Sequence, residues 1–386
     1  MTERAYFDWN ATAPLRPEAR AAMMEAFGLP GNPSSIHAEG RAARRTIEVA
    51  RGKVAALVGA DPAAVTFTSG GTEANALALS PHWSTTPYRR LLVSAVEHPS
   101  VLAGGRFAPA DIEQVPVTAD GVVDLAALAA RLRGLADQLP LVSVMLANNE
   151  SGVIQPVSAV AQLVHEAGGL LHVDAVQAVG RVSCDIKALG ADLLTLSAHK
   201  IGGPKGVGAL VRRTTDLHPQ EPLMRGGGQE RGLRAGTENV AAIAGFGAVA
   251  AAIHAGWPEE ATRMRAARDR LESEIRAVSP QAVIFGENAE RLPNTTLFTI
   301  PGLKAETAII ALDLDGVALS SGAACSSGKV QPSHVLTAMG VAPDLARGAL
   351  RVSLGATTTE SDIQTFVQAW KKLSESLLKR RTSIAA

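Results

Sequence analysis

The chain has 386 residues, 46% hydrophobic and 19% charged, which is typical of a folded globular protein large enough for two domains. Lysine plus arginine and aspartate plus glutamate both number 37, so no overall charge favours nucleic acid or anionic lipid as a partner. We find neither a signal peptide nor an uncharged apolar run of membrane-spanning length, and we therefore expect a cytoplasmic protein without a membrane partner.

Short apolar runs alternate with helix-like segments in the first two thirds of the chain. Continuous apolar runs of this kind are typical of strands buried on both faces, so they predict an α/β fold with a mostly parallel sheet. The segments 123–139 and 156–169 have helical periodicity and serve as crossovers that flank the sheet. The predicted strands lie within 64–75, 90–100, 140–152, 169–180, 192–203 and 206–213.

The composition of the sequence changes at about residue 255. A charged amphipathic helix is predicted over 258–278. We predict a large domain over 16–254. A small C-terminal α+β domain is formed by 1–15 together with 255–386. Its predicted strands and its closing helix lie within 294–300, 305–322, 349–355 and 360–380.

Polar side chains follow the predicted strands at the point where each strand ends. In open α/β sheets, ligands bind outside the carboxyl ends of the strands, so several such residues in one sheet predict a shared site. The residues concerned are Thr72, His98, Asn149, Asp174, Gln177, Ser197, His199 and Lys200.

Asp174 and Lys200 together suggest a cofactor. A carboxylate in an apolar strand needs a cation or strong donors, and a lone aspartate there is usually a helix cap or an ion-pair partner. A lysine at a strand end is usually solvated, but in a partly desolvated pocket it becomes an amine nucleophile. Pyridoxal phosphate requires both groups, a lysine for covalent attachment and an acid opposite its pyridine nitrogen.

The turn "TSGGTEAN" after the first strand supplies a candidate phosphate site. Two glycines, including Gly71, and Thr72 precede a predicted helix whose free N–H groups attract an anion, and Ser197 and His199 could add donors. His98 could stack over the ring or simply be a hydrogen-bonded loop residue. Asn149 and Gln177 could orient the ring hydroxyl or cap helices.

Other phosphate and metal motifs do not fit the sequence. The segment "GAACSSGKV" has its glycines one residue too far apart for a P-loop and lacks the hydroxyl residue that binds magnesium. No GxGxxG opens a helix in the required context, and no HExxH is present. A nucleotide-binding or metal-dependent enzyme is therefore disfavoured.

The two cysteines lie far apart and form neither a disulfide framework nor a CxxC zinc motif. Cys325 lies in the Gly- and Ser-rich segment 319–334, which predicts a mobile loop over about 320–330. A partly exposed thiol that can ionise is reactive, and a loop permits both properties. We interpret Cys184 as structural.

At this point the motifs resemble those of a known family. "DWNATAP", "GNPSSIHAEGRAAR", "NNESGVIQP", "HVDAVQAVG", "SAHKIGGPKGVGAL", "GGGQERGLRAGTEN" and "SSGAACSSG", in this order, are similar to motifs of the cysteine desulfurases. These are fold-type I enzymes that use pyridoxal phosphate, within the class V aminotransferase group. The resemblance covers residues 6 to about 370.

The resemblance implies a role for each matching residue. Lys200 would bind the cofactor covalently, Asp174 would face its pyridine nitrogen and Gln177 its phenolic oxygen. His98 would stack on the ring and move protons. Asn149 and Arg351 would bind the substrate carboxylate, for which a planar arginine fork is well suited. Phosphate ligands would be Gly71, Thr72, Ser197 and His199, with Thr237 reaching the phosphate of the neighbouring subunit.

The resemblance also implies a reaction and its partners. Cys325 would take sulfur from L-cysteine as a persulfide, leaving alanine, and pass it to an acceptor or iron–sulfur scaffold protein. The enzyme would be a homodimer. No metal site is expected, except that Cys325 could transiently ligate an iron–sulfur cluster. The alternatives are a selenocysteine lyase or a class V aminotransferase, the latter having no use for Cys325.

Overall fold

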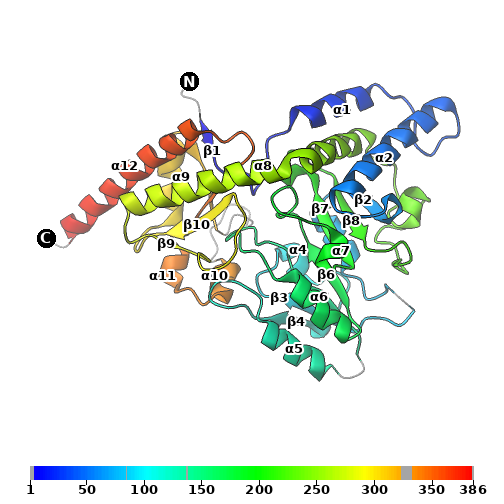
Figure 1. Ribbon diagram of the computed structural model, residues 1–386, viewed down its shortest axis with the longest axis horizontal. Coiled ribbons are helices and arrows are strands. Elements are labelled where there is room, and N and C mark those ends of the chain that lie inside the picture. Colours follow the sequence, from blue (N-terminus) through cyan, green and yellow to red (C-terminus); the bar gives the residue numbers. More distant parts are fainter. Residues whose placement is uncertain (1–3, 84, 136–137, 323–332, 385–386) are drawn as a thin grey trace.

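Figure 1 shows a computed structural model of the chain, which describes residues 4–83, 85–135, 138–322 and 333–384. Its larger sheet has seven strands in the order β2-β8-β7-β6-β5-β3-β4. The strands are β2 (Val65–Thr68), β3 (Arg90–Ser94), β4 (Ile112–Val115), β5 (Pro140–Ser143), β6 (Leu170–Asp174), β7 (Leu193–Ser197) and β8 (Gly208–Arg212).

The strands of this sheet run parallel except for β8, which is antiparallel to both of its neighbours, β2 and β7. The predicted α/β class with a mostly parallel sheet is therefore confirmed. β8 reverses direction because only residues 198–207 separate it from β7, which is too short for the crossover that a parallel partner needs. The sequence interpretation omitted β4, whose residues Ile112–Val115 include a glutamate and a glutamine.

Helices cover both faces of the large sheet (Figure 1). The predicted crossovers are present as α5 (Leu125–Gly134) and α6 (Val157–Glu166). The other helices of this part are α1 (Pro17–Phe27), α2 (Ala38–Leu57), α3 (Gly71–Ala78), α4 (Pro99–Leu102) and α7 (Ile186–Leu189), with short 3-10 turns at Pro62–Ala64, Pro109–Asp111, Ala198–Lys200 and Gln229–Gly232.

The smaller part of the fold has its own core. Its antiparallel sheet has the order β12-β13-β10-β9, and a separate parallel pair joins β1 to β11. The rings of Phe366 and Trp370 stack with centroids 6.5 Å apart in this core. The elements are β1 (Ala5–Tyr6), β9 (Val283–Ile284), β10 (Thr295–Thr299), β11 (Val317–Ala318), β12 (Ser320–Ser321), β13 (Leu350–Ser353), α9 (Ala305–Leu314), α10 (His334–Ala338), α11 (Pro343–Ala346) and α12 (Glu360–Ile384).

One long helix, α8 (Val240–Val278), runs between the two cores (Figure 1). Its first half packs with the large core through Phe246, and its last turns pack with the small core through Leu271. The predicted domain boundary after residue 254 falls within this helix and stays a prediction.

The expectation that no uncharged apolar run reaches membrane-spanning length was wrong for α8. By length and composition this helix could span a membrane, but 56% of its apolar window is buried inside the fold. A core helix of a globular protein meets the same criteria, because it is apolar on the faces that pack against its neighbours.

Candidate active site

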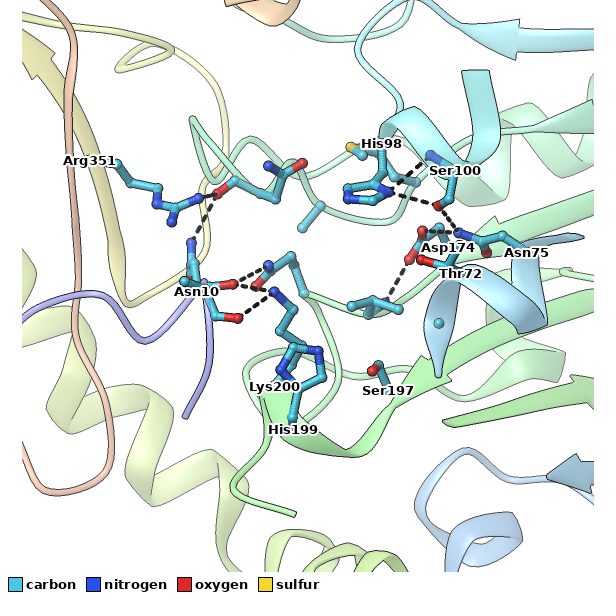
Figure 2. A pocket seen from close by; sticks show the side chains of 17 residues that line it. Asn10, Thr72, Asn75, His98, Ser100, Asp174, Ser197, His199, Lys200 and Arg351 are labelled. Atoms are coloured by element: carbon cyan, nitrogen blue, oxygen red, sulfur yellow. Dashed lines mark hydrogen bonds between the residues drawn. The ribbon is translucent and has the colours of Figure 1, made fainter. Parts of the chain in front are cut away.

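A cavity of about 330 Å³ opens beyond the carboxyl ends of the central strands (Figure 2). Both Asp174 and Lys200 line it, so the amine and the carboxylate face one space. The other predicted site residues in its lining are Gly71, Thr72, His98, Asn149, Gln177, Ser197, His199 and Arg351.

Asp174 is the last residue of β6 and is 6% exposed. Its Oδ2 accepts a hydrogen bond from Nδ2 of Asn75 (2.8 Å), and its Oδ1 accepts one from the backbone N–H of Val176 (2.9 Å). These donors stabilise a carboxylate that burial would otherwise disfavour. Asp174 therefore provides a fixed negative charge on the wall of the cavity.

His98 lies at the N-terminal end of α4, after β3. Its Nδ1 accepts a hydrogen bond from the backbone N–H of Ser100 (3.1 Å) and lies 2.7 Å from the Ser100 hydroxyl oxygen. Burial lowers the pKa of His98, and the positive charge of Lys200 acts in the same direction, whereas Asp174 raises this pKa. The ring lines the cavity on the side nearest Asp174 (Figure 2).

Lys200 ends the 3-10 turn that follows β7. Its Nζ donates to the carbonyl oxygens of Asn10 (2.5 Å) and Ala11 (2.9 Å), which belong to the N-terminal segment. Gln177 Nε2 donates to the same Asn10 carbonyl (2.9 Å). The other end of this amide, Oε1, accepts from Nη1 of the buried Arg181 (2.7 Å), which fixes the direction of the Gln177 side chain.

The first turn of α3 offers the anion site that the sequence predicted. No side chain caps this turn, so its first N–H groups are available to a phosphate. Glycine at position 71 leaves room in this turn, since a Cβ there would lie 3.0 Å from Cγ2 of Val176, a tight contact. Burial lowers the pKa of His199 to about 4, so its ring is neutral at pH 7 and meets an anion through hydrogen bonds.

Arg351, on β13, brings the smaller part of the fold into the site. Its Nη1 donates to the carbonyl oxygen of Asn149 (2.9 Å), and its Nη2 forms an ion pair with Oδ1 of Asp8 (2.8 Å). The side chain is 2% exposed, and its Nε has no hydrogen-bond partner among the residues that the structure describes. One guanidinium therefore joins the cavity to the N-terminal segment.

One predicted site residue, Thr237, is not in the lining of this cavity. Thr237 is exposed and lines a separate hollow near the end of β2, together with Arg234 and Glu238. Cys325 lies outside the described residues. Burial raises the pKa of the Cys184 thiol to about 12, so this cysteine remains protonated and does not act as a thiolate.

Sequence reasoning missed four residues that complete the site, namely Asn75, Ser100, Asn10 and Ala11. Asn75 lies one helical turn after Thr72, a spacing that places both on one face of α3. Ser100 could have been found from the "HPS" sequence, because proline favours the first position of a helix. Asn10 and Ala11 act through backbone carbonyls, for which the side-chain pattern gives no signal.

Comparison with known proteins shows the family to which the chain belongs. The chain matches the class V aminotransferase family over residues 5–366. It is 44% identical to a cysteine desulfurase of Cereibacter sphaeroides, over 97% of each chain. The chain belongs to the cysteine desulfurases of this family. The resemblance seen in the sequence is thereby confirmed.

Solved structures agree with this membership. A NifS-like protein from Rickettsia africae matches with a TM-score of 0.88 and 36% identity, over 97% of this chain and 100% of that one. The structure titled SspA in complex with cysteine matches with a TM-score of 0.77 and 29% identity, over 92% of this chain and 100% of that one. The cysteine desulfurases of this family depend on pyridoxal phosphate.

The residues present fit that cofactor. The Asp174 side chain accepts two hydrogen bonds at the cavity wall, the α3 turn is uncapped, and Gly71 leaves room beside Val176. Among the residues that the structure describes, no group of three histidine, cysteine, aspartate or glutamate side chains could hold a metal ion.

Proposed function

We propose that this chain is a cysteine desulfurase that uses pyridoxal phosphate to remove sulfur from L-cysteine, giving L-alanine and a persulfide on Cys325. The observation that carries the proposal is that the Lys200 amine and the Asp174 carboxylate line one cavity beside an uncapped helix start. Family membership supports the same activity.

Different residues of the chain would bind the cofactor and the substrate. Bound pyridoxal phosphate supplies an electron sink for the carbon that loses its proton. Lys200 supplies the amine that attaches it, and Asp174 places a negative charge beside it. Arg351 meets the substrate carboxylate with its planar fork, and this binding orients the reacting bond.

Cys325 would complete the reaction as the nucleophile that takes the sulfur. The thiolate sulfur of Cys325 bonds to the sulfur of cysteine as the carbon–sulfur bond breaks, and the released carbon keeps that electron pair and is protonated to alanine. The persulfide would then pass to a sulfur-acceptor or iron–sulfur scaffold protein. We propose a cytoplasmic homodimer in which Thr237 serves the neighbouring subunit's site.

Selenocysteine lyase and aminotransferase activities are the alternatives. The relatives that the chain resembles are named as cysteine desulfurases, which favours cysteine desulfuration over both alternatives. An aminotransferase would need Lys200 and Asp174 but would gain nothing from Cys325.

Mass spectrometry of cysteine-treated enzyme tests the proposal. We expect wild-type protein to gain the mass of one sulfur atom on Cys325 and to release alanine. Cys325→Ser should lose both, and Lys200→Ala should lose the visible absorption of the covalently bound cofactor.

Cys184→Ser is the matched control, because it removes the other thiol while leaving the site intact. Alanine release at the wild-type rate by Cys325→Ser would overturn the role of Cys325, and sulfur found on Cys184 would do the same. Turnover by Lys200→Ala would overturn the role of the cofactor lysine.

A further inference from the structure

We propose that Asn75 and Ser100 are positioning residues that hold His98 as the neutral tautomer with its proton on Nε2, so that His98 acts as a hydrogen-bond donor in the site and not as a general base. The proposal deepens the proposed function and rests on it. It follows from a line of hydrogen bonds that begins at Asp174 and ends at the imidazole ring (Figure 2).

The direction of the line is set at Asp174. An ionised carboxylate only accepts hydrogen bonds, so the atom of Asn75 that lies 2.8 Å from Oδ2 must be the amide nitrogen. The reverse orientation would bring two acceptor oxygens together in a buried place. Asn75 is 1% exposed, and water does not relieve such a contact there.

The second amide hydrogen of Asn75 fixes the role of Ser100. Asn75 Nδ2 also lies 2.9 Å from Ser100 Oγ and donates to it. The Ser100 oxygen therefore accepts on this side, and its own proton is directed to the other neighbour, which is His98 Nδ1 at 2.7 Å.

His98 Nδ1 thus faces two donors. One is the Ser100 hydroxyl, and the other is the Ser100 backbone N–H at 3.1 Å, whose hydrogen cannot turn away. A proton on Nδ1 would oppose both of them. The ring proton must then be on Nε2, the nitrogen on the far side of the ring from Ser100 (Figure 2).

The charged surroundings of His98 agree with a neutral ring. Desolvation is the largest influence and lowers the pKa of His98, and Lys200 and His334 lower it further, while Asp174 raises it. A neutral imidazole with its proton on Nε2 has no lone pair on that nitrogen. It can donate a hydrogen bond to charge that develops on the reacting atoms, as neutral histidine does in other enzymes.

Nitrogen NMR of histidine-labelled holoenzyme tests the inference. The spectrum distinguishes a protonated from an unprotonated ring nitrogen, and His98→Gln assigns the His98 signals. We expect wild-type His98 to show a protonated Nε2 and an unprotonated Nδ1 across neutral pH. Asn75→Asp should raise the proton affinity of His98, because an aspartate there would accept the Ser100 hydroxyl proton that Nδ1 otherwise receives.

Ser100→Ala gives a second and milder test. It removes one donor to the Nδ1 lone pair and keeps the backbone N–H, so the tautomer should persist while the proton affinity of His98 rises about tenfold. This variant also covers the case in which Asn75→Asp fails to fold. A purely structural role for Ser100 would leave the His98 titration where it is in the wild type.

Ser143→Ala is the matched control. Ser143 Oγ lies 2.8 Å from Nδ1 of the buried His172, a serine–histidine pair between two strands of the large sheet, so this change should move the His172 signals and leave His98 unaltered. A wild-type His98 protonated on Nδ1 or on both nitrogens would overturn the inference, even if the enzyme desulfurates cysteine. The predicted tautomer in a protein that releases no alanine would overturn the proposed function alone.

Discussion

Arg351 shows how one side chain joins the substrate site to the start of the chain. Its guanidinium is buried, forms an ion pair with Asp8 and donates to the Asn149 carbonyl. An ion pair buried to this degree is costly unless its hydrogen bonds are well formed, so Asp8 holds the fork in one orientation. We infer that this orientation preorganises the arginine for a carboxylate ligand.

Arg351→Lys should therefore raise KM for L-cysteine by roughly tenfold or more and change kcat much less. Lysine keeps the charge but loses the planar fork, and a charge-assisted hydrogen bond contributes about 1.5–3 kcal/mol. Steady-state kinetics of alanine release measures both constants.

The matched control for this change is Arg347→Lys, which alters an exposed arginine paired with Asp344 and should leave both constants unchanged. An unaltered KM in Arg351→Lys would remove the substrate role of Arg351. A fall in kcat alone would point instead to a group that acts only in the transition state.

Individual residues were predictable where a side chain had to satisfy a strong local requirement. Asp174 and Lys200 were conspicuous because charge at the end of an apolar strand needs a reason. Asn75 was not conspicuous, because a neutral asparagine in a helix needs no charged partner. Its role depends on a hydrogen bond to Ser100, which only the folded chain brings close. Backbone carbonyls such as that of Asn10 leave no trace in side-chain chemistry.

At the level of elements, Glu150 joins the loop after β5 to the start of α10. Its Oε2 accepts from Ser333 Oγ (2.5 Å), and Ser333 Oγ in turn accepts from the backbone N–H of Leu336 (3.1 Å) at the first turn of α10. Burial raises the pKa of Glu150 to about 7, against the lowering effects of Ser333 and Arg351. The carboxyl is therefore partly protonated near neutral pH.

The sign of the pH effect follows from this raised pKa. The folded state holds the Glu150 proton up to about pH 7, whereas the unfolded chain releases it near 4.5, so the contribution to stability is complete at low pH and is lost as pH rises. Glu150→Gln should reduce the loss of unfolding free energy between pH 5 and pH 8 by up to roughly 3 kcal/mol.

Denaturant unfolding at the two pH values measures this difference. Glu306→Gln on the exposed face of α9 is the control and should leave the pH dependence as it is in the wild type. An equal pH dependence in Glu150→Gln and wild type would show that Glu150 is ionised in the folded state at all of these pH values.

The elements themselves were predictable where burial dominates the pattern. Apolar runs gave six of the strands, but such runs carry no direction, and the reversal of β8 follows from the length of the link to β7. α8 is one helix although its composition changes near Pro258, because it packs on both cores.

At the level of the whole molecule, α1 and α2 lie near one end of the fold (Figure 1), and this part of the chain carries exposed apolar residues. Phe27 is 68% exposed and Ile36, in the link between the two helices, is 90% exposed. We infer that these exposed apolar residues belong to an interaction surface. Their position suits the homodimer that we propose.

Replacing Phe27 and Ile36 together by glutamate should convert the dimer to monomer, because it puts two charges into an apolar interface. Sedimentation velocity measures the change. Ile310→Glu with Leu314→Glu on α9 is the matched control, as it alters another exposed apolar pair and should leave the dimer intact. A wild-type monomer, or dissociation by the α9 pair instead, would contradict this assignment.

The N-terminal segment contributes both to the smaller core and to the candidate active site, so its truncation affects both. β1 pairs with β11 and Phe7 is buried in the smaller core. Three residues further on, the Asn10 carbonyl receives hydrogen bonds from Lys200 and Gln177. Shortening the amino terminus by a dozen residues, a change commonly regarded as harmless trimming, would withdraw the groups that steer the reactive amine. A loss of activity after such a truncation would come from the missing carbonyls that bind the Lys200 amine, and not from misfolding alone.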